Sequence, residues 1–394
     1  MMPTPPACRV RADEWEARVG RIGVITLDAG DRLNALTLGT ARTMLQQLTQ
    51  WKYDERIAVV VLHAASEKAF CAGGDLREMY AAQKAMAPDG ASARVQASEH
   101  IKAFLQWEYR LDYELHTYAK PVLCWGHGLV MGGGLGLMVG CSHRVVTEFS
   151  QLSMPEIAIG HFPDVAGSWF LNRMPGRTGL FAGLTGAVVH PGDVVFAKLA
   201  DYVVPQVRKE AIFDQLRAQS WSLPRERNDE LLGRVLRAAS AECEPGERPL
   251  HEHCDLVTEL CSRETVPDIV AAITALRDSN DPWLRDAASR LASGYPGSAW
   301  LVHALLKRTA HLSLAQVFSI EYAVAIRSVE YGQFMEGIRA LIIEKDRRPH
   351  WDRKIDEIDD AWVDDAFFKP LPAAENPLLG LGDGPPLPPA KTWA

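Results

Sequence analysis

Two continuous apolar segments, each followed by glycines, constrain the fold of this chain most strongly. Residues 58–65 (AVVVLHAA) precede Gly73 and Gly74, and residues 121–125 (PVLCW) precede the triplet Gly132–Gly134. Apolar runs of this length are typical of strands that are covered on both faces, as they are in parallel sheets. Helical spacing follows each glycine cluster, so the order of strand, glycine turn and helix repeats. We therefore predict an α/β architecture with largely parallel strands.

The 394-residue chain divides into four segments by its sequence patterns. Residues 1–14 are expected to form a mobile, proline-containing arm, and residues 15–205 carry the strand and glycine pattern of an α/β core. Residues 206–369 show helical spacing with few strand signals, and residues 370–394 are rich in proline and glycine. We expect a large core, a mainly helical C-terminal extension packed onto it, and an irregular tail.

The overall charge argues against nucleic acid as a general partner. The formal net charge is −8, whereas a nucleic-acid binder needs a clustered basic surface. No uncharged apolar run reaches the length of a membrane span, because the candidate over residues 121–141 is too rich in glycine. We expect neither nucleic acid nor membrane among the partners.

The cysteines indicate a reducing environment. There are seven of them, no two form a Cys-x-x-Cys motif, and Cys124 and Cys141 lie in apolar surroundings. This pattern fits buried, reduced thiols better than a disulfide framework. The first residues also lack the basic and apolar regions of a secretory signal, so the expected location is cytoplasmic.

The two glycine clusters are candidates for binding an oxyanion. Gly73 and Gly74 follow a buried strand, and open α/β sheets bind ligands at the carboxyl ends of their strands. The triplet Gly132–Gly134 opens a helix, where free N–H groups and the helix dipole favour negative charge. The alternative is that these glycines only permit tight turns or close packing.

Two carboxylates, Glu156 and Asp164, lie eight residues apart in the segment MPEIAIGHFPD. Such a pair can move protons, activate water or attack a carbonyl carbon. Two nearby carboxyl groups rarely ionise independently, so the pKa of one of them should rise. The structural alternatives are a helix-start carboxylate for Glu156 and a helix N-cap for Asp164.

Competing motifs fail on inspection. The chain has no phosphate-binding P-loop, no G-x-G-x-x-G in its second glycine cluster and no G-x-S-x-G nucleophile elbow. The segment His251–Cys254 (HEHC) contains metal-ligand residue types without the H-E-x-x-H spacing, in polar, proline-flanked surroundings. We expect a surface loop there and no metal site.

Three segments resemble the crotonase (enoyl-CoA hydratase/isomerase) superfamily: residues 70–75, 126–136 and 154–167. Within it, the pattern Met-Pro-Glu-x-x-Ile-Gly-x-Phe-Pro-Asp-Val resembles the 3-hydroxyisobutyryl-CoA hydrolase branch, as do the C-terminal segments 319–322 and 334–346. The resemblance implies a spiral of ββα units that binds an acyl-CoA with its thioester oxygen on the N–H groups of Gly74 and Gly133. It also implies that Glu108 contacts the substrate, whereas the alternative for Glu108 is a solvent-facing helical acid.

The departures from hydratases narrow the expected chemistry. Hydratases of this family carry a glutamate where this chain has Gly136, and many carry glycine where it has Asp164. Because the acid pair has moved, addition of water to an alkene is disfavoured. By resemblance to the hydrolases, Glu156 acts as general base or nucleophile. Asp164 holds water, contacts the substrate hydroxyl or shares a proton with Glu156.

The expected function is hydrolysis of a short-chain 3-hydroxyacyl-CoA thioester, with 3-hydroxyisobutyryl-CoA of valine degradation as the implied substrate. No metal or redox cofactor is expected, since CoA is part of the substrate. Two alternatives stay open: a crotonase-fold hydratase or isomerase acting on another acyl-CoA, and a non-catalytic acyl-CoA-binding protein. Family members often assemble as trimers, so a homo-oligomer is expected unless the helical extension covers that surface.

Overall fold

The strands of the computed structural model form two sheets that run side by side. The model describes residues 9–86, 96–221, 224–244 and 246–383. A six-stranded sheet has the order β1-β2-β3-β5-β7-β9 and a three-stranded sheet the order β4-β6-β8. All described pairings between named strands are parallel except that of β1 with β2. In chain order the strands are β1 (Val10–Glu16), β2 (Arg21–Leu27), β3 (Ile57–Ala64), β4 (Ala69–Cys71), β5 (Val122–Gly126), β6 (Leu129–Met131), β7 (His143–Val146), β8 (Gln151–Ser153) and β9 (Tyr202–Val203).

From β3 to β9, consecutive strands alternate between the two sheets. β3 and β4, β5 and β6, and β7 and β8 each place their first strand in the large sheet and their second in the small one. A helical segment follows each of these pairs. The result is the expected spiral of ββα units, in which equivalent turns recur at the same edge.

β3 explains why residues 58–65 carry no polar alternation. Val60 and Leu62 face one hydrophobic cluster, and Val59 and Val61 face the other. Both faces of the sheet are therefore covered. Each of these side chains contributes about 1.5–3 kcal/mol by burial.

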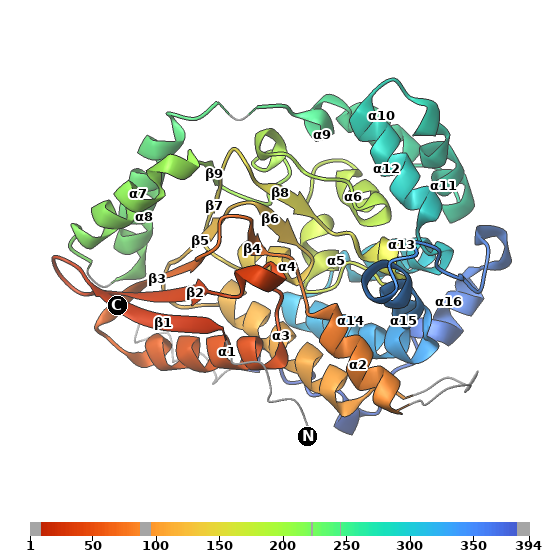
Figure 1. Ribbon diagram of the computed structural model, residues 1–394, viewed down its shortest axis with the longest axis horizontal. Helices are drawn as coiled ribbons and strands as arrows, with labels where there is room; N and C mark the ends of the chain where they lie inside the picture. The colour runs from red at the N-terminus through yellow and green to blue at the C-terminus, as the bar shows by residue number, and fades with distance from the viewer. Residues whose placement is uncertain (1–8, 87–95, 222–223, 245, 384–394) are drawn as a thin grey trace.

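The helices cover the sheets and extend well beyond them (Figure 1). α1 and α3 lie against one face of the large sheet, and α7 and α8 cover the other near one end. The α-helices are α1 (Leu38–Tyr53), α2 (Leu76–Met86), α3 (Glu99–His116), α4 (Gly133–Val139), α5 (Gly167–Leu171), α6 (Thr178–Thr185), α7 (Lys209–Arg217), α8 (Arg225–Ser240), α9 (Pro249–Glu252), α10 (Cys254–Leu260), α11 (Val266–Thr274), α12 (Pro282–Ser293), α13 (Pro296–Thr309), α14 (Leu314–Tyr331), α15 (Gln333–Ile338) and α16 (Asp360–Phe367). The short helical turns are η1 (Gly30–Arg32), η2 (Glu156–Ile159), η3 (Pro191–Asp193), η4 (Gln206–Arg208), η5 (Ala275–Asp278), η6 (Arg339–Ile343), η7 (Ile355–Glu357) and η8 (Ala373–Glu375). No helix in these described ranges is both long and apolar enough to cross a membrane.

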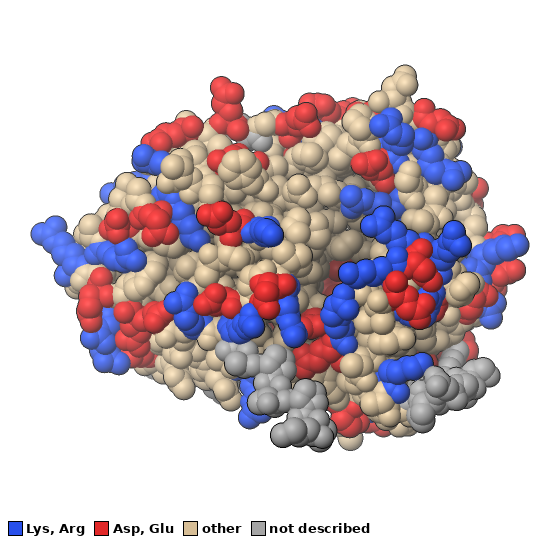
Figure 2. All heavy atoms as spheres, viewed as in Figure 1, with Lys and Arg blue, Asp and Glu red and all other residues tan. Residues whose placement is uncertain are grey.

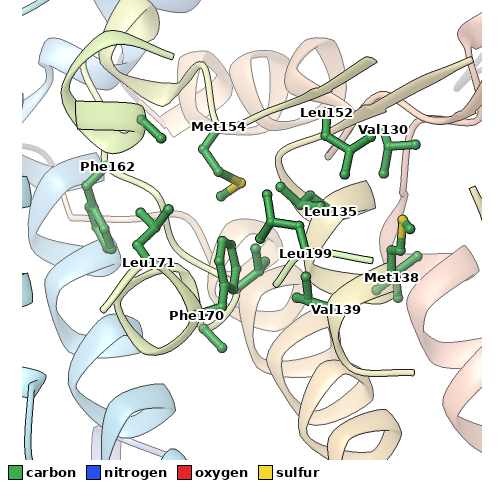
Figure 3. Close-up of a cluster of buried hydrophobic side chains, with 14 of the residues drawn as sticks. Val130, Leu135, Met138, Val139, Leu152, Met154, Phe162, Phe170, Leu171 and Leu199 are labelled. Atoms are coloured by element: carbon green, nitrogen blue, oxygen red, sulfur yellow. The ribbon is translucent and has the colours of Figure 1, made fainter. Parts of the chain in front are cut away.

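A cluster of buried apolar side chains fixes the ends of β6 and β8 (Figure 3). It joins these two strands to α4, α5 and the segment between them. Because Met131 and Ser153 end these strands, the cluster sets where the glycine triplet and η2 begin. Its labelled members are Val130, Leu135, Met138, Val139, Leu152, Met154, Phe162, Phe170, Leu171 and Leu199.

A strand occupies part of the segment that was expected to form a mobile N-terminal arm. Residues 1–8 lie outside the described residues, but Val10–Glu16 forms β1 and pairs antiparallel with β2. The expectation of a mobile arm is therefore wrong for residues 10–14. Charged and polar residues interrupt the apolar pattern of this strand, because it lies at the edge of the sheet and pairs with one strand only. Its sequence therefore did not indicate a strand.

The C-terminal helical extension packs onto the core, as expected. α13 contacts α5 and α6, α14 contacts α3, and α15 contacts η2. The described part of the tail is largely irregular, and Asn376 and Pro377 hydrogen-bond to Ser319 and Arg110. The extension therefore adds walls to the edge of the core where the glycine loops lie.

The close contact of α15 with η2 predicts opposite effects for two glycine substitutions. A Cβ atom on Gly337 would overlap the backbone of Ile159, whereas one on exposed Gly39 in α1 would meet only Thr37 Oγ1, at 3.6 Å. We expect Gly337→Ala to lower the free energy of unfolding by about 1–3 kcal/mol through overpacking. Gly39→Ala should raise it by up to about 1 kcal/mol through helix propensity. Urea titration of both variants measures the difference, and equal effects would contradict this packing.

Candidate active site

All five predicted site residues line one cavity of about 90 Å³. Gly74 lies between β4 and α2, Gly133 begins α4, and Glu108 lies in α3. Glu156 begins η2, and Asp164 follows in the segment before α5. The fold thus brings together residues that are far apart in the sequence.

The two glycine loops touch each other at this cavity. Gly73 has a φ of +97°, and a Cβ atom there would lie 3.6 Å from the nitrogen of Gly133. Within the part of the chain that the structure describes, no protein acceptor is found for the N–H of Gly74 or Gly133. Two free backbone donors close together are what an oxyanion hole requires.

Two buried carboxylates border the glycine triplet. A Cβ atom on Gly132 would lie 2.8 Å from Oε1 of Glu156, and one on Gly133 would overlap Oε1 of Glu108. Burial, and next the charge of Asp164, raise the pKa values of Glu156 and Glu108 well above the ordinary range. Oε2 of Glu156 is buried without a hydrogen-bond partner. It is therefore a free acid or base that faces the cavity.

Asp164 is held by side chains that the sequence analysis did not identify. The hydroxyl of Tyr109 donates a hydrogen bond of 2.6 Å to Oδ2 of Asp164, and Nε2 of His161 lies 3.7 Å from the same oxygen. Burial and the nearby carboxylates raise the pKa of Tyr109 well above its ordinary value, so the phenol keeps its proton and remains a donor. Tyr109 follows Glu108 in the sequence, but the predicted role of Glu108 did not indicate that Tyr109 would contact Asp164.

His161 links the core to the C-terminal extension. Its ring stacks on Phe334 of α15 at 4.4 Å, and its Nδ1 is hydrogen-bonded to Ser328 of α14 at 3.0 Å. The sequence does place a histidine between Glu156 and Asp164, which was the one indication that His161 belongs to the site. Its partners lie far away in sequence, so the signal was weak.

The structure excludes the simpler alternatives for Glu108 and Asp164. Glu108 is buried rather than solvent-facing, and the N-cap of α5 is Ala166, so Asp164 is not its N-cap. Glu156 does begin a helical turn, yet its carboxylate is buried at the cavity. All three acids therefore line the same cavity.

The position of Gly136 is closed to a side chain. A Cβ atom there would lie 2.6 Å from the Cβ of Val165 and 3.3 Å from Oδ2 of Asp112. The space that a second catalytic glutamate would need is therefore filled. This agrees with the expected relocation of the acid pair.

The segment His251–Cys254 is helical, so the expectation of a loop is wrong. His251 and Glu252 end α9, and Cys254 begins α10. His253 pairs with Asp281 at 2.9 Å. Across the described residues, no group of three or more potential ligands is placed to hold a metal ion.

The ββα spiral and the paired glycine loops define the class of protein. The family model for enoyl-CoA hydratase/isomerase matches residues 22–367, and this chain belongs to that family. The matched range includes most of the predicted core and most of the helical extension. The cavity described above is therefore the candidate active site of a family member.

The chain is also similar to individual curated proteins. It is 34% identical over 339 residues to the mitochondrial 3-hydroxyisobutyryl-CoA hydrolase of Danio rerio, covering 85% of this chain and 83% of that protein. It is 32% identical over 335 residues to the protein of the same name from Homo sapiens, covering 84% and 82%. The predicted resemblance to this hydrolase branch is confirmed.

Two solved structures share the whole architecture. A carnitinyl-CoA dehydratase from Mycobacterium thermoresistibile has a TM-score of 0.78 at 32% identity, covering 92% of this chain and 97% of that chain. An enoyl-CoA hydratase from Rhodobacter sphaeroides 2.4.1 has a TM-score of 0.75 at 31% identity, covering 91% and 97%. The predicted crotonase-like fold with a helical extension is confirmed.

The expected cytoplasmic location is contradicted. The curated relatives from Danio rerio, Homo sapiens and other vertebrates are named as mitochondrial enzymes. The six cysteines that the structure describes are free thiols, as predicted. Free thiols report a reducing environment and not a particular compartment, and this is why the inference failed.

Asp112 provides a test of how the buried acids affect stability. Both of its oxygens are buried without a partner, and burial and then Glu108 raise its pKa well above the ordinary range. A folded-state pKa above the unfolded value means that the folded protein loses stability as pH rises from about 4, where unfolded Asp titrates. We expect Asp112→Asn to be more stable than the parent at pH 8, by about 1 kcal/mol or more. Its free energy of unfolding should also fall less steeply than that of the parent as pH rises.

Urea unfolding at pH 5 and pH 8 measures this effect. Asp13→Asn, at an exposed position of β1, is the control and should change neither value by more than about 0.5 kcal/mol. A parent-like pH dependence in Asp112→Asn would show that Asp112 does not carry the effect.

Proposed function

We propose that this chain hydrolyses a short 3-hydroxyacyl-CoA thioester, with 3-hydroxyisobutyryl-CoA as the substrate. The observation that carries the proposal is the placement of Glu156 and Asp164 beside the free N–H groups of Gly74 and Gly133. The space at Gly136 is filled by Val165, so the second acid of a hydratase has no place there. The names of the curated relatives support the same reaction and substrate. A role in valine degradation is part of the proposal and rests on the resemblance alone.

The N–H groups of Gly74 and Gly133 would bind the thioester oxygen and stabilise its charge in the tetrahedral intermediate. Mutagenesis of comparable donors indicates about 3–4 kcal/mol for each. The carboxylate of Glu156 either takes a proton from the attacking water or adds to the carbonyl carbon itself. On the first route the carbon–sulfur bond then breaks, and the CoA sulfur takes up the proton that Glu156 removed from water. On the second route the break leaves an anhydride on Glu156 and a CoA thiolate that takes a proton from water, and the remaining hydroxide hydrolyses the anhydride and restores the carboxylate.

Asp164 and Glu108 are proposed to contact the acyl part of the substrate. Tyr109 fixes one oxygen of Asp164, which leaves the other for water or the substrate hydroxyl. Glu108 is buried among apolar side chains with a raised pKa, so its neutral form can donate a hydrogen bond. Such a donor suits the hydroxyl of a 3-hydroxyacyl group.

The surroundings of the cavity suit a CoA ester. Figure 2 shows a hollow in the surface where Figure 1 places α4 and α15, with Lys and Arg side chains near its rim. Basic side chains favour the phosphates of CoA. Thioester hydrolysis changes no oxidation state, and the backbone N–H groups and carboxylates of the site can supply its chemistry, so we propose that no redox cofactor or resident metal takes part. The predicted lack of nucleic-acid and membrane partners and the predicted homo-oligomer remain predictions.

The proposal predicts that Glu156→Gln abolishes most thioesterase activity. An amide can neither take a proton from water nor attack the thioester, so kcat should fall by about 10²–10⁴-fold. Release of free thiol from 3-hydroxyisobutyryl-CoA measures the reaction. Glu99→Gln, at an exposed position of α3, is the control and should keep the parental rate.

Three outcomes would contradict the proposal. Full activity in Glu156→Gln would remove Glu156 from the mechanism. Loss of enoyl absorbance without thiol release would favour a hydratase or isomerase. Tight binding of CoA esters without turnover across C3–C5 acyl groups would favour a binding protein.

A separate experiment distinguishes the two routes proposed for Glu156. Single turnover in heavy-oxygen water labels Glu156 only if an anhydride forms.

The raised pKa of Glu156 predicts the pH dependence of the reaction. Activity needs the ionised carboxylate, so kcat/KM should rise with pH at values above about 4.3, where an ordinary glutamate titrates. The charge of Asp164 contributes to the rise of this pKa, so Asp164→Asn should move the rising limb to lower pH in its residual activity. Thiol release followed from pH 5 to 9 measures both profiles. If the rising part of the pH profile is unchanged in Asp164→Asn, the charge of Asp164 does not raise the pKa of Glu156.

A further inference from the structure

The turn that follows Asp164 is strained. Val165 and Ala166 have φ angles of +51° and +65°, in the left-handed region that side chains other than glycine rarely adopt. Such conformations cost about 1–3 kcal/mol each and persist only where the surroundings hold them. Asp164 therefore depends on whatever holds this turn.

A buried glutamate from the C-terminal extension holds the turn. One carboxylate oxygen of Glu321, in α14, accepts a hydrogen bond of 2.8 Å from the N–H of Ala166. The other accepts from the N–H and the hydroxyl of Ser168, at 2.9 and 2.5 Å. These donors lie at the start of α5, which has no side-chain cap of its own. Glu321 satisfies them from 153 residues away in the sequence.

The same face of α14 also supports the other contact of Asp164. The ring of Tyr109 lies 5.8 Å from Phe318 and 6.4 Å from Tyr322, the latter in an edge-on arrangement. The hydroxyl of Tyr109 in turn donates a hydrogen bond to Asp164. One turn of α14 thus fixes both the backbone and the hydrogen-bond donor of this acid.

We propose that Glu321 is a positioning residue, which aims the carboxylate of Asp164 into the cavity by holding the Val165–Ala166 turn. It does not line the cavity and acts only through Asp164. The inference rests on the proposed function, because it presumes that Asp164 takes part in thioester hydrolysis. It makes the helical extension a part of the catalytic apparatus.

The competing explanation is that Glu321 only stabilises the packing of α5. Asn172 provides the matched control, because it ties the other end of α5 to the extension. Its side-chain amide donates to the carbonyls of Ser168 and Leu306, at 2.8 and 3.0 Å, and to Thr309 Oγ1 at 3.2 Å. Asn172 follows the last residue of α5, away from the strained turn. A purely structural role would make the two residues equivalent.

The test compares Glu321→Gln with Asn172→Ala in the full-length protein. The amide nitrogen of glutamine cannot accept a hydrogen bond, so one side of the turn loses its partner. We expect kcat for thiol release to fall by about 10- to 100-fold in Glu321→Gln, as for small misplacements of catalytic groups, with KM within about 2-fold. Ser168→Ala, which removes a single bond, should lower kcat in the same direction but less. Asn172→Ala should lower the melting temperature with kcat within about 2-fold.

The outcomes separate this inference from the proposed function. Asp164→Asn serves as the reference for loss of that acid. If the parent protein releases no thiol, or Asp164→Asn keeps full activity, the proposed function or the role of Asp164 fails. If Asp164→Asn is impaired and Glu321→Gln loses stability but keeps its kcat, the positioning role of Glu321 alone is overturned. Equal losses of kcat in Glu321→Gln and Asn172→Ala would also overturn it.

Discussion

The close approach of two glycine loops is the contact on which the rest of the structure depends. A Cβ atom on Gly134 would overlap the carbonyl of Cys71, so α4 can pack against β4 only without side chains there. This approach leaves the N–H groups of Gly74 and Gly133 beside one cavity and lets two buried carboxylates lie against the triplet. The geometry of backbone donors and acids follows from packing that only glycine permits.

Much of the core could be predicted because its signals are local. The apolar run of β3 and the glycine turns each lie within a few residues, and the structure has both. Motifs identified three acids, and the structure places all of them in one cavity: Glu108, Glu156 and Asp164. β1 was missed because an edge strand with one packed side carries little apolar pattern.

The support of the site could not be predicted because it comes from distant parts of the chain. Tyr109, His161 and Glu321 bond to partners that lie 55, 167 and 153–155 residues away. No spacing rule links such residues, since they meet only after α3, α14 and the segment around α5 pack together. The compartment was misjudged for a different reason, because the state of a thiol depends on redox conditions that more than one compartment provides.

The wall that Val329 and Phe334 add to the cavity has a consequence for the order in which the protein matures. Synthesis proceeds from the N-terminus, so the β sheets, η2 and their acids emerge well before α14 and α15. Until those helices dock, the cavity lacks this wall, so burial raises the pKa of Glu156 less than it does in the complete fold. The full rise of this pKa is therefore reached only at the last step of folding, and a chain that ends before α14 would carry the acids of the site in a more solvated cavity.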